Sequence, residues 1–153
     1  MLRFFILLTF IPAIILANTN GIKNCAGNPP LPIETSVRSC SQTPCDIKLG
    51  ERTGIDIIFK APRDISTFKP KARAHVLGIG IDHDLPEDIV NGACDNLSAG
   101  ECPIPEGTVV EYNFELLVSS SYPPTKNIDV DISLLDQDDK VIVCSRITIN
   151  AIR

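Results

Sequence analysis

The chain has 153 residues, a net charge of -5 and an aromatic content of only 5%. This charge argues against nucleic acid as a partner, because phosphate binding needs clustered lysines and arginines. Tryptophan is absent, so any core must consist mainly of isoleucine, leucine and valine.

An apolar leader opens the chain. Arg3 is followed by a nearly unbroken apolar run that ends at the small residue Ala17. This order of charge, apolar run and small residue is typical of a signal peptide. The run is too short for a membrane-spanning helix, which needs roughly 20 apolar residues. We therefore expect residues 1–17 to be cleaved and residues 18–153 to form one secreted, soluble domain.

Six cysteines follow the leader: Cys25, Cys40, Cys45, Cys94, Cys102 and Cys144. In an oxidising compartment they are expected to be half-cystines rather than metal ligands or nucleophiles. Sequence alone leaves several pairings open. The segments 40–45 and 94–102 are short, polar and turn-forming, which favours a bridge within each. Cys25 and Cys144 remain, and their bridge would tie the start of the mature chain to its last strand.

Period-two hydrophobicity dominates the mature chain. Strands are expected around Val37 and at 46–49, 55–59, 72–81, 110–118, 128–134 and 147–151. Gly78 and Gly80 interrupt the fourth of these segments, where they mark a bulge or a close backbone approach. The stretch 84–92 can hold one helical turn at most. Seven or eight short strands separated by turns predict an all-β sandwich or barrel.

The chain contains two histidines, His75 and His83. His75 lies inside a predicted strand, where we expect it to be packed or hydrogen-bonded. His83 lies in an acidic loop, and we expect it on the surface. No nucleophile elbow or other local signature accompanies either residue, so the sequence does not predict an enzyme.

Acidic clusters at 82–84 and 136–139 could suggest a metal site. Both lack the longer ligand series of a calcium loop, and 136–139 falls where a hairpin must turn. We expect a solvated turn there, with no metal and no cofactor. Asn96-Leu97-Ser98 is an N-glycosylation sequon in an expected exposed loop, which makes Asn96 a candidate glycosylation site.

Seven short segments carry a family resemblance: 22–25, 40–45, 92–94, 102–104, 121–123, 138–140 and 143–144. Together they resemble the ML lipid-recognition family, above all its sterol-transfer members and their arthropod relatives, over essentially the whole mature chain. The resemblance implies an immunoglobulin-like β-sandwich of two antiparallel sheets, with seven to eight strands and an apolar pocket between the sheets. It also implies the bridges Cys25–Cys144, Cys40–Cys45 and Cys94–Cys102.

Carried over by position, the pocket wall of the family's sterol carriers falls on Leu85, Val118, Tyr122 and Ile132. Ile132 stands in a strand that carries tryptophan in the sterol carriers, and Leu85 stands where they have phenylalanine. The segment 81–89 is acidic here, whereas theirs is rich in proline and apolar. The Tyr122 hydroxyl is expected near the pocket entrance as a polar handle.

The function implied by the resemblance is extracellular lipid binding and transport, with the lysosomal lumen as a further location. The ligand is expected to be a sterol, a fatty acid or a similar apolar molecule, carried by a monomer that contacts a membrane or receptor transiently at the pocket mouth. The alternative is an innate-immune module that recognises microbial lipids, although the acidic mouth disfavours anionic glycolipids. An enzyme or a solid-cored adhesion module forms the third and least favoured class.

Overall fold

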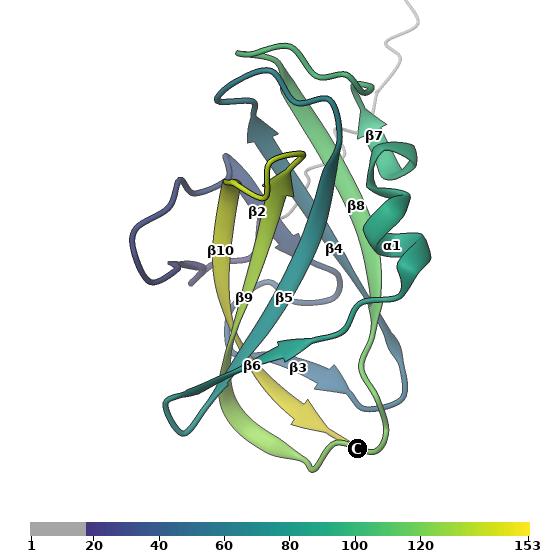
Figure 1. Ribbon diagram of the computed structural model, residues 1–153. Helices are drawn as coiled ribbons and strands as arrows, with labels where there is room; N and C mark the ends of the chain where they lie inside the picture. Colours follow the sequence, from purple (N-terminus) through teal and green to yellow (C-terminus); the bar gives the residue numbers. More distant parts are fainter. Residues whose placement is uncertain (1–17) are drawn as a thin grey trace, which may run out of the picture.

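Two β-sheets packed face to face make up the protein. The computed structural model describes residues 18–153, so the leader expected at 1–17 lies outside the described residues. Figure 1 shows the sheets as two layers. Within residues 18–153, no helix is long and apolar enough to cross a bilayer.

The larger sheet contains β1 (Lys23–Asn24), β3 (Cys45–Lys48), β5 (Phe68–Val76), β6 (Ile79–His83), β9 (Thr125–Asp136) and β10 (Val141–Ile152). Its order is β1-β10-β9-β5-β6, and β3 also pairs with β10. The smaller sheet contains β2 (Glu34–Val37), β4 (Arg52–Lys60), β7 (Leu97–Ala99) and β8 (Val109–Leu117), in the order β2-β4-β8-β7. The helix α1 (Glu87–Asn91) and the 3-10 turn η1 (Ala93–Asn96) lie between β6 and β7 along the chain.

The predicted sandwich is confirmed. Inward residues alternate with polar ones as expected: on β8, Val110, Tyr112 and Phe114 are buried, while Glu111 and Asn113 are only half-buried. The prediction of seven to eight strands was too low, because β1 and β7 have only two and three residues and are too short to show a period. Among the named strands of residues 18–153, all pairings are antiparallel except the one between β3 and β10, which is parallel.

The segment 72–81, expected as one strand, is instead a hairpin. β5 and β6 pair antiparallel and meet at a two-residue turn of Leu77 and Gly78, with φ angles of 51° and 81°. Positive φ at both central residues is the geometry of a tight hairpin turn whose twist matches the flanking strands. Gly80 has no side chain, and the guanidinium of Arg73 occupies the space where a Cβ atom would lie.

One end of the sandwich is filled by aromatic side chains. Ring centroids lie 6.0 Å apart for Phe59 and Phe68, 5.1 Å for Phe68 and Tyr112, and 5.3 Å for Tyr112 and Phe114. Burial raises the pKa of the Tyr112 hydroxyl. Four of the five aromatic residues in residues 18–153 are thus concentrated at this end of the sandwich.

The margins of the sandwich are tied by covalent bonds and by the short helical segment. The three disulfides are Cys25–Cys144, Cys40–Cys45 and Cys94–Cys102, the pairing that locality favours, and the described chain has no free cysteine. The first spans 119 residues, for which chain-entropy models give about 5 kcal/mol of stabilisation. On the other margin, α1 and η1 insert Ile89 and Ala93 into the core, with α1 against β5 and η1 against β5 and β8.

The turn at 136–139 differs from the expected solvated turn, because the side chain of Asp136 is fully buried. Its carboxylate accepts hydrogen bonds from the main-chain N–H groups of Asp138 and Lys140, each at 2.9 Å, and from Arg63 Nε at 2.6 Å. Burial alone would raise the pKa of this carboxyl, but these hydrogen bonds outweigh it and hold the pKa below its ordinary value. The carboxylate therefore organises the turn from inside.

We expect Asp136→Asn to lower the free energy of unfolding by about 2 kcal/mol at pH 7, because Arg63 and the turn lose a charged acceptor. A carboxyl with a lowered folded-state pKa stabilises above its unfolded pKa of about 3.9, and this contribution is lost as the pH falls. The difference between wild type and variant should therefore shrink between pH 7 and pH 3 in urea titrations.

The matched control is Asp139→Asn. Asp139 is exposed and pairs only with Lys69 at the surface, and asparagine also accepts its φ of 59°. We expect this variant to leave stability nearly unchanged. An Asp136→Asn effect of the same size at both pH values would contradict the role given to the charge.

Candidate functional site

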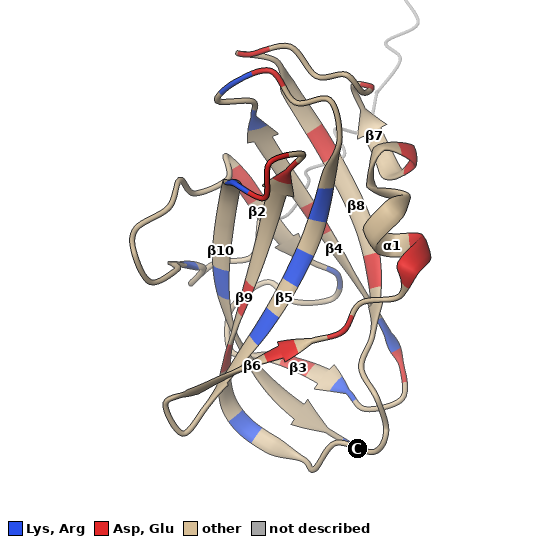
Figure 2. Cartoon of the chain, in the orientation of Figure 1, with Lys and Arg blue, Asp and Glu red and all other residues tan. Residues whose placement is uncertain are grey.

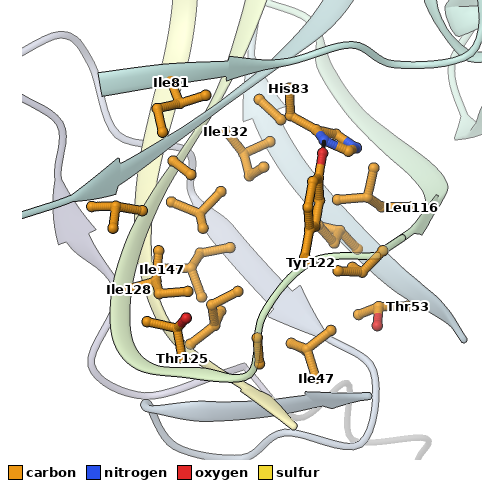
Figure 3. A pocket seen from close by; sticks show the side chains of 18 of the residues that line it. Ile47, Thr53, Ile81, His83, Leu116, Tyr122, Thr125, Ile128, Ile132 and Ile147 are labelled. Carbon is orange, nitrogen blue, oxygen red and sulfur yellow. Dashed lines mark hydrogen bonds between the residues drawn. The ribbon is translucent and has the colours of Figure 1, made fainter. Parts of the chain in front are cut away.

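The end of the sandwich away from the aromatic cluster is hollow. A cavity of about 330 Å³ lies between the sheets, within the size range of small-molecule sites. Its wall comes from β2, β3, β4, β5, β6, β8, β9, β10 and the loop between β8 and β9, and it is apolar except for Thr53, Asp82, His83, Tyr122 and Thr125. Figure 3 shows aliphatic side chains pointing into this space from both sheets.

The cavity follows from a fall in side-chain size along β5. The inward positions of this strand pass from Phe68 in the aromatic cluster to Ala72 and Ala74 in the cavity wall. On β9, Ile132 and Val130 lie directly beside the two alanines and line the same wall. Cβ atoms alone cannot fill an inter-sheet gap of about 10 Å, so space remains there.

The cavity reaches the surface beside the β5–β6 hairpin. Two of its lining residues, Ile81 on β6 and Tyr122 in the β8–β9 loop, are 54% and 45% exposed. His83 Nδ1 lies 2.9 Å from Tyr122 Oη, and the two rings meet edge to face (Figure 3). This hydrogen bond joins an edge strand of the larger sheet to the segment that follows β8 of the smaller sheet. It spans the mouth of the cavity.

The structure places three of the four residues expected in the pocket wall at the cavity: Val118, Tyr122 and Ile132. Leu85 is not among the lining residues, because the chain leaves β6 for α1 and Leu85 packs, half-buried, against the core. The segment around it contributes His83 instead.

His83 was expected on the surface, but it is half-buried at the cavity mouth. The sequence held a signal for this position. Ile79, Ile81 and His83 alternate along β6, so Ile81 and His83 share a face of the strand. A single strand over 72–81 ends before His83, so that expectation does not include this alternation.

The acidic mouth expected from the sequence is partly balanced by nearby cations. Asp82 lies within 3.4 Å of Lys71 Nζ and of Arg73 Nη1, so its charge is offset by two cations. These cations belong to a row of basic residues along β5 (Figure 2). The pairs are about half exposed, so each contributes little to stability, and they offset one of the four acidic residues of the segment 81–89.

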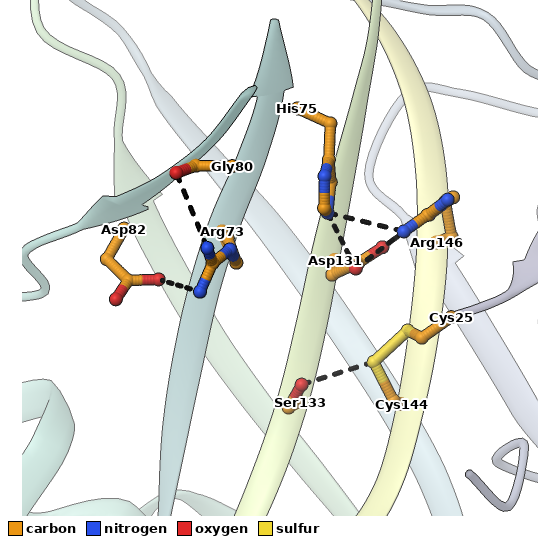
Figure 4. A network of polar contacts seen from close by, with 9 residues as sticks. All are labelled: Cys25, Arg73, His75, Gly80, Asp82, Asp131, Ser133, Cys144 and Arg146. Carbon is orange, nitrogen blue, oxygen red and sulfur yellow. Dashed lines mark hydrogen bonds and ion pairs between the residues drawn. A yellow bond between two sulfur atoms is a disulfide. The ribbon is translucent and has the colours of Figure 1, made fainter. Parts of the chain in front are cut away.

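His75 behaves as predicted, as a hydrogen-bonded strand residue. On the outer face of the larger sheet, its Nε2 lies 2.8 Å from Asp131 Oδ2, and Arg146 binds both carboxylate oxygens at 2.6 and 2.8 Å (Figure 4). Burial alone would raise the Asp131 pKa, but the hydrogen bonds from Arg146 and His75 lower it; Asp131 in turn raises the Arg146 pKa. The network lies across the sheet from the cavity and braces three strands.

Two other kinds of site considered from the sequence were a metal site and a glycosylation site. Among residues 18–153, no three His, Cys, Asp or Glu side chains are grouped so that they could hold a metal ion. Asn96 is exposed at the end of η1 rather than in an irregular loop, and its Nδ2 donates to the Gly92 carbonyl at 2.8 Å. Its glycosylation remains a prediction.

Known proteins share this architecture. The NPC intracellular cholesterol transporter 2 of Danio rerio is 24% identical over 121 residues, which cover 78% of this chain and 76% of that protein. A crystal structure of a Niemann-Pick type C2 protein from the Japanese carpenter ant has a TM-score of 0.72 at 17% identity and covers 86% of this chain and 98% of its own. The crystal structure of chicken MD-1 complexed with lipid IVa has a TM-score of 0.51 at 14% identity and covers 83% of this chain and 85% of its own. The family model of the ML domain matches residues 19–151, and this chain therefore belongs to the ML domain family.

Proposed function

We propose that this protein is a secreted, monomeric carrier that binds one sterol, fatty acid or similar apolar molecule in the inter-sheet cavity without transforming it. The observation that carries the proposal is the cavity itself, which is hollow, open at one end and almost wholly apolar. Family membership supports lipid recognition as its use. Extracellular fluid and the lysosomal lumen are the proposed locations.

Burial of the ligand supplies the binding energy. A CH₂ group gains about 0.8 kcal/mol when it moves from water into an apolar site. An acyl chain of some 16 carbons therefore gains more than about 10 kcal/mol before the cost of ordering is subtracted. Val118, Tyr122 and Ile132 are the proposed contacts. Because the wall is aliphatic, it suits flexible chains as well as rigid rings.

Recognition of microbial lipids is the second candidate. Its support is the likeness in fold to chicken MD-1, which was crystallised with lipid IVa. Binding an anionic glycolipid would require cations free to meet its phosphates. Lys71 and Arg73, which lie beside Asp82 of the cavity wall, are both engaged with it, which favours the carrier over the immune module.

We further propose that the β5–β6 hairpin contacts a lipid bilayer when the ligand enters or leaves. Leu77 at its tip is 97% exposed, and Ile79 and Ile81 are 66% and 54% exposed. Three aliphatic side chains exposed in one hairpin form a patch of the kind that marks a membrane or protein contact. Ile81 also lines the cavity, so the patch continues into the mouth.

Native mass spectrometry of the purified, secreted protein is expected to show a co-purifying lipid bound one to one. The reason is that an open apolar cavity binds lipid from the medium of the producing cells. The mass would name the ligand class, separating sterols from fatty acids and glycolipids. A protein that stays ligand-free even after incubation with mixed lipids would contradict the carrier function.

We expect Ala74→Phe and Val118→Asp each to weaken binding of a dansyl-labelled undecanoic acid by more than about a hundredfold, by filling the cavity or by placing a charge in its wall. Fluorescence titration measures the affinity. The control is Ala99→Phe on the exposed strand β7, which adds the same ring away from the cavity. Circular dichroism must show each variant folded, and wild-type affinity in a folded Ala74→Phe protein would overturn the assignment.

Leu77→Asn should slow transfer of the dansyl probe to phosphatidylcholine vesicles several-fold without changing its affinity. Asparagine accepts the positive φ at this position, so the turn is kept while the apolar contact is lost. The control is Leu31→Asn, at an exposed leucine that does not line the cavity. Unchanged transfer rates would rule out the hairpin as the bilayer contact.

A further inference from the structure

The polar groups in the cavity wall are few, and most are already engaged. Thr125 donates to a nearby main-chain carbonyl at 3.1 Å, and Asp82 pairs with two basic side chains of β5. The groups that remain to meet a ligand are the hydroxyl of Thr53 and the pair formed by His83 and Tyr122. Of these, the pair stands at the mouth, where a ligand's polar end can keep contact with water.

The His83–Tyr122 pair has a hydrogen-bond donor to spare. A neutral imidazole carries one N–H and a phenol carries one O–H. The contact between Nδ1 and Oη uses one of these two protons, whichever group donates it. The second proton, on His83 Nε2 or on Tyr122 Oη, has no acceptor among residues 18–153. A protonated imidazole would add a donor. In every state, the pair can therefore donate to an acceptor supplied from outside the protein.

The surrounding charge admits a negatively charged acceptor. Asp82, the neighbour of His83, is offset by Lys71 and Arg73 at 3.4 Å. Asp84 is exposed, so water and salt screen its charge. Both His83 and Tyr122 are partly exposed, and a carboxylate held there would not be fully desolvated.

We propose that His83 and Tyr122 bind the polar head of the ligand, which is an amphiphile with an aliphatic body and one terminal hydroxyl or carboxylate. The head accepts a hydrogen bond from the spare donor at the mouth, and the body runs inward past Ile128 toward Ala72. This inference rests on the proposed carrier function. It makes His83 a specificity-determining residue, on a segment that differs from the sterol-carrier pattern.

The test compares two ligands with one headless probe. N-phenylnaphthylamine, an uncharged apolar dye, reports the cavity alone, and dodecanoic acid and dodecanol compete with it. The variants are Tyr122→Phe and His83→Phe, which keep a ring at each position but remove its polar atoms. Thr53→Val is the control, because it removes the other hydroxyl from the same wall.

Both ring variants keep an aromatic ring at the mouth, so we expect their affinity for the acid, the alcohol or both to fall about tenfold further than their affinity for the dye, the effect of one lost hydrogen bond. Loss for the acid alone identifies a carboxylate head, and loss for the alcohol identifies a hydroxyl head. The inference is overturned if neither competitor is affected, or if Thr53→Val produces the loss instead. If the wild-type protein binds neither the dye nor either competitor, the carrier function itself fails.

Discussion

The structure depends on an unequal division of side-chain volume between the two ends of one sandwich. At one end, Phe59, Phe68, Tyr112 and Phe114 interlock and supply most of the aromatic contact between the sheets. Each such ring buries on the order of 150–250 Å². At the other end β5 offers only small side chains, beginning with Ala72, and the sheets enclose space instead. The filled end holds the sheets at the spacing that keeps the other end hollow.

Restraints on both margins preserve that spacing. On one margin, the Cys25–Cys144 bridge and a 2.7 Å hydrogen bond between Thr35 Oγ1 and Ser145 Oγ tie β10 to the segments around it. On the opposite margin, α1 and η1 close the filled half, and the contact between His83 and Tyr122 spans the hollow half. Access to the cavity lies on this margin, where Ile81 and Tyr122 line it and are exposed.

The interior of the cavity and its mouth differ in chemistry. Its aliphatic interior can supply affinity for many chains and rings, because burial of CH₂ groups is not directional. Discrimination needs directional groups, and these gather at the mouth with the exposed hairpin of Leu77. Under the proposed carrier function, this division lets ligand choice change with a few residues at the mouth while the interior stays the same.

The alternation in the sequence by itself predicted a sandwich or barrel, because it fixes which face of each strand is buried, and the shortness of two cysteine segments favoured two local bridges. The family resemblance selected the sandwich. It also pointed to Val118, Tyr122 and Ile132, which lie in the cavity wall. Only the tertiary structure decided that Asp136 is buried and that His83 meets Tyr122, since both depend on residues distant in the chain. The cavity, too, could not be predicted from the alternation in the sequence. Alternation shows that a residue points inward, but whether its side chain meets a ring or empty space depends on the opposing sheet.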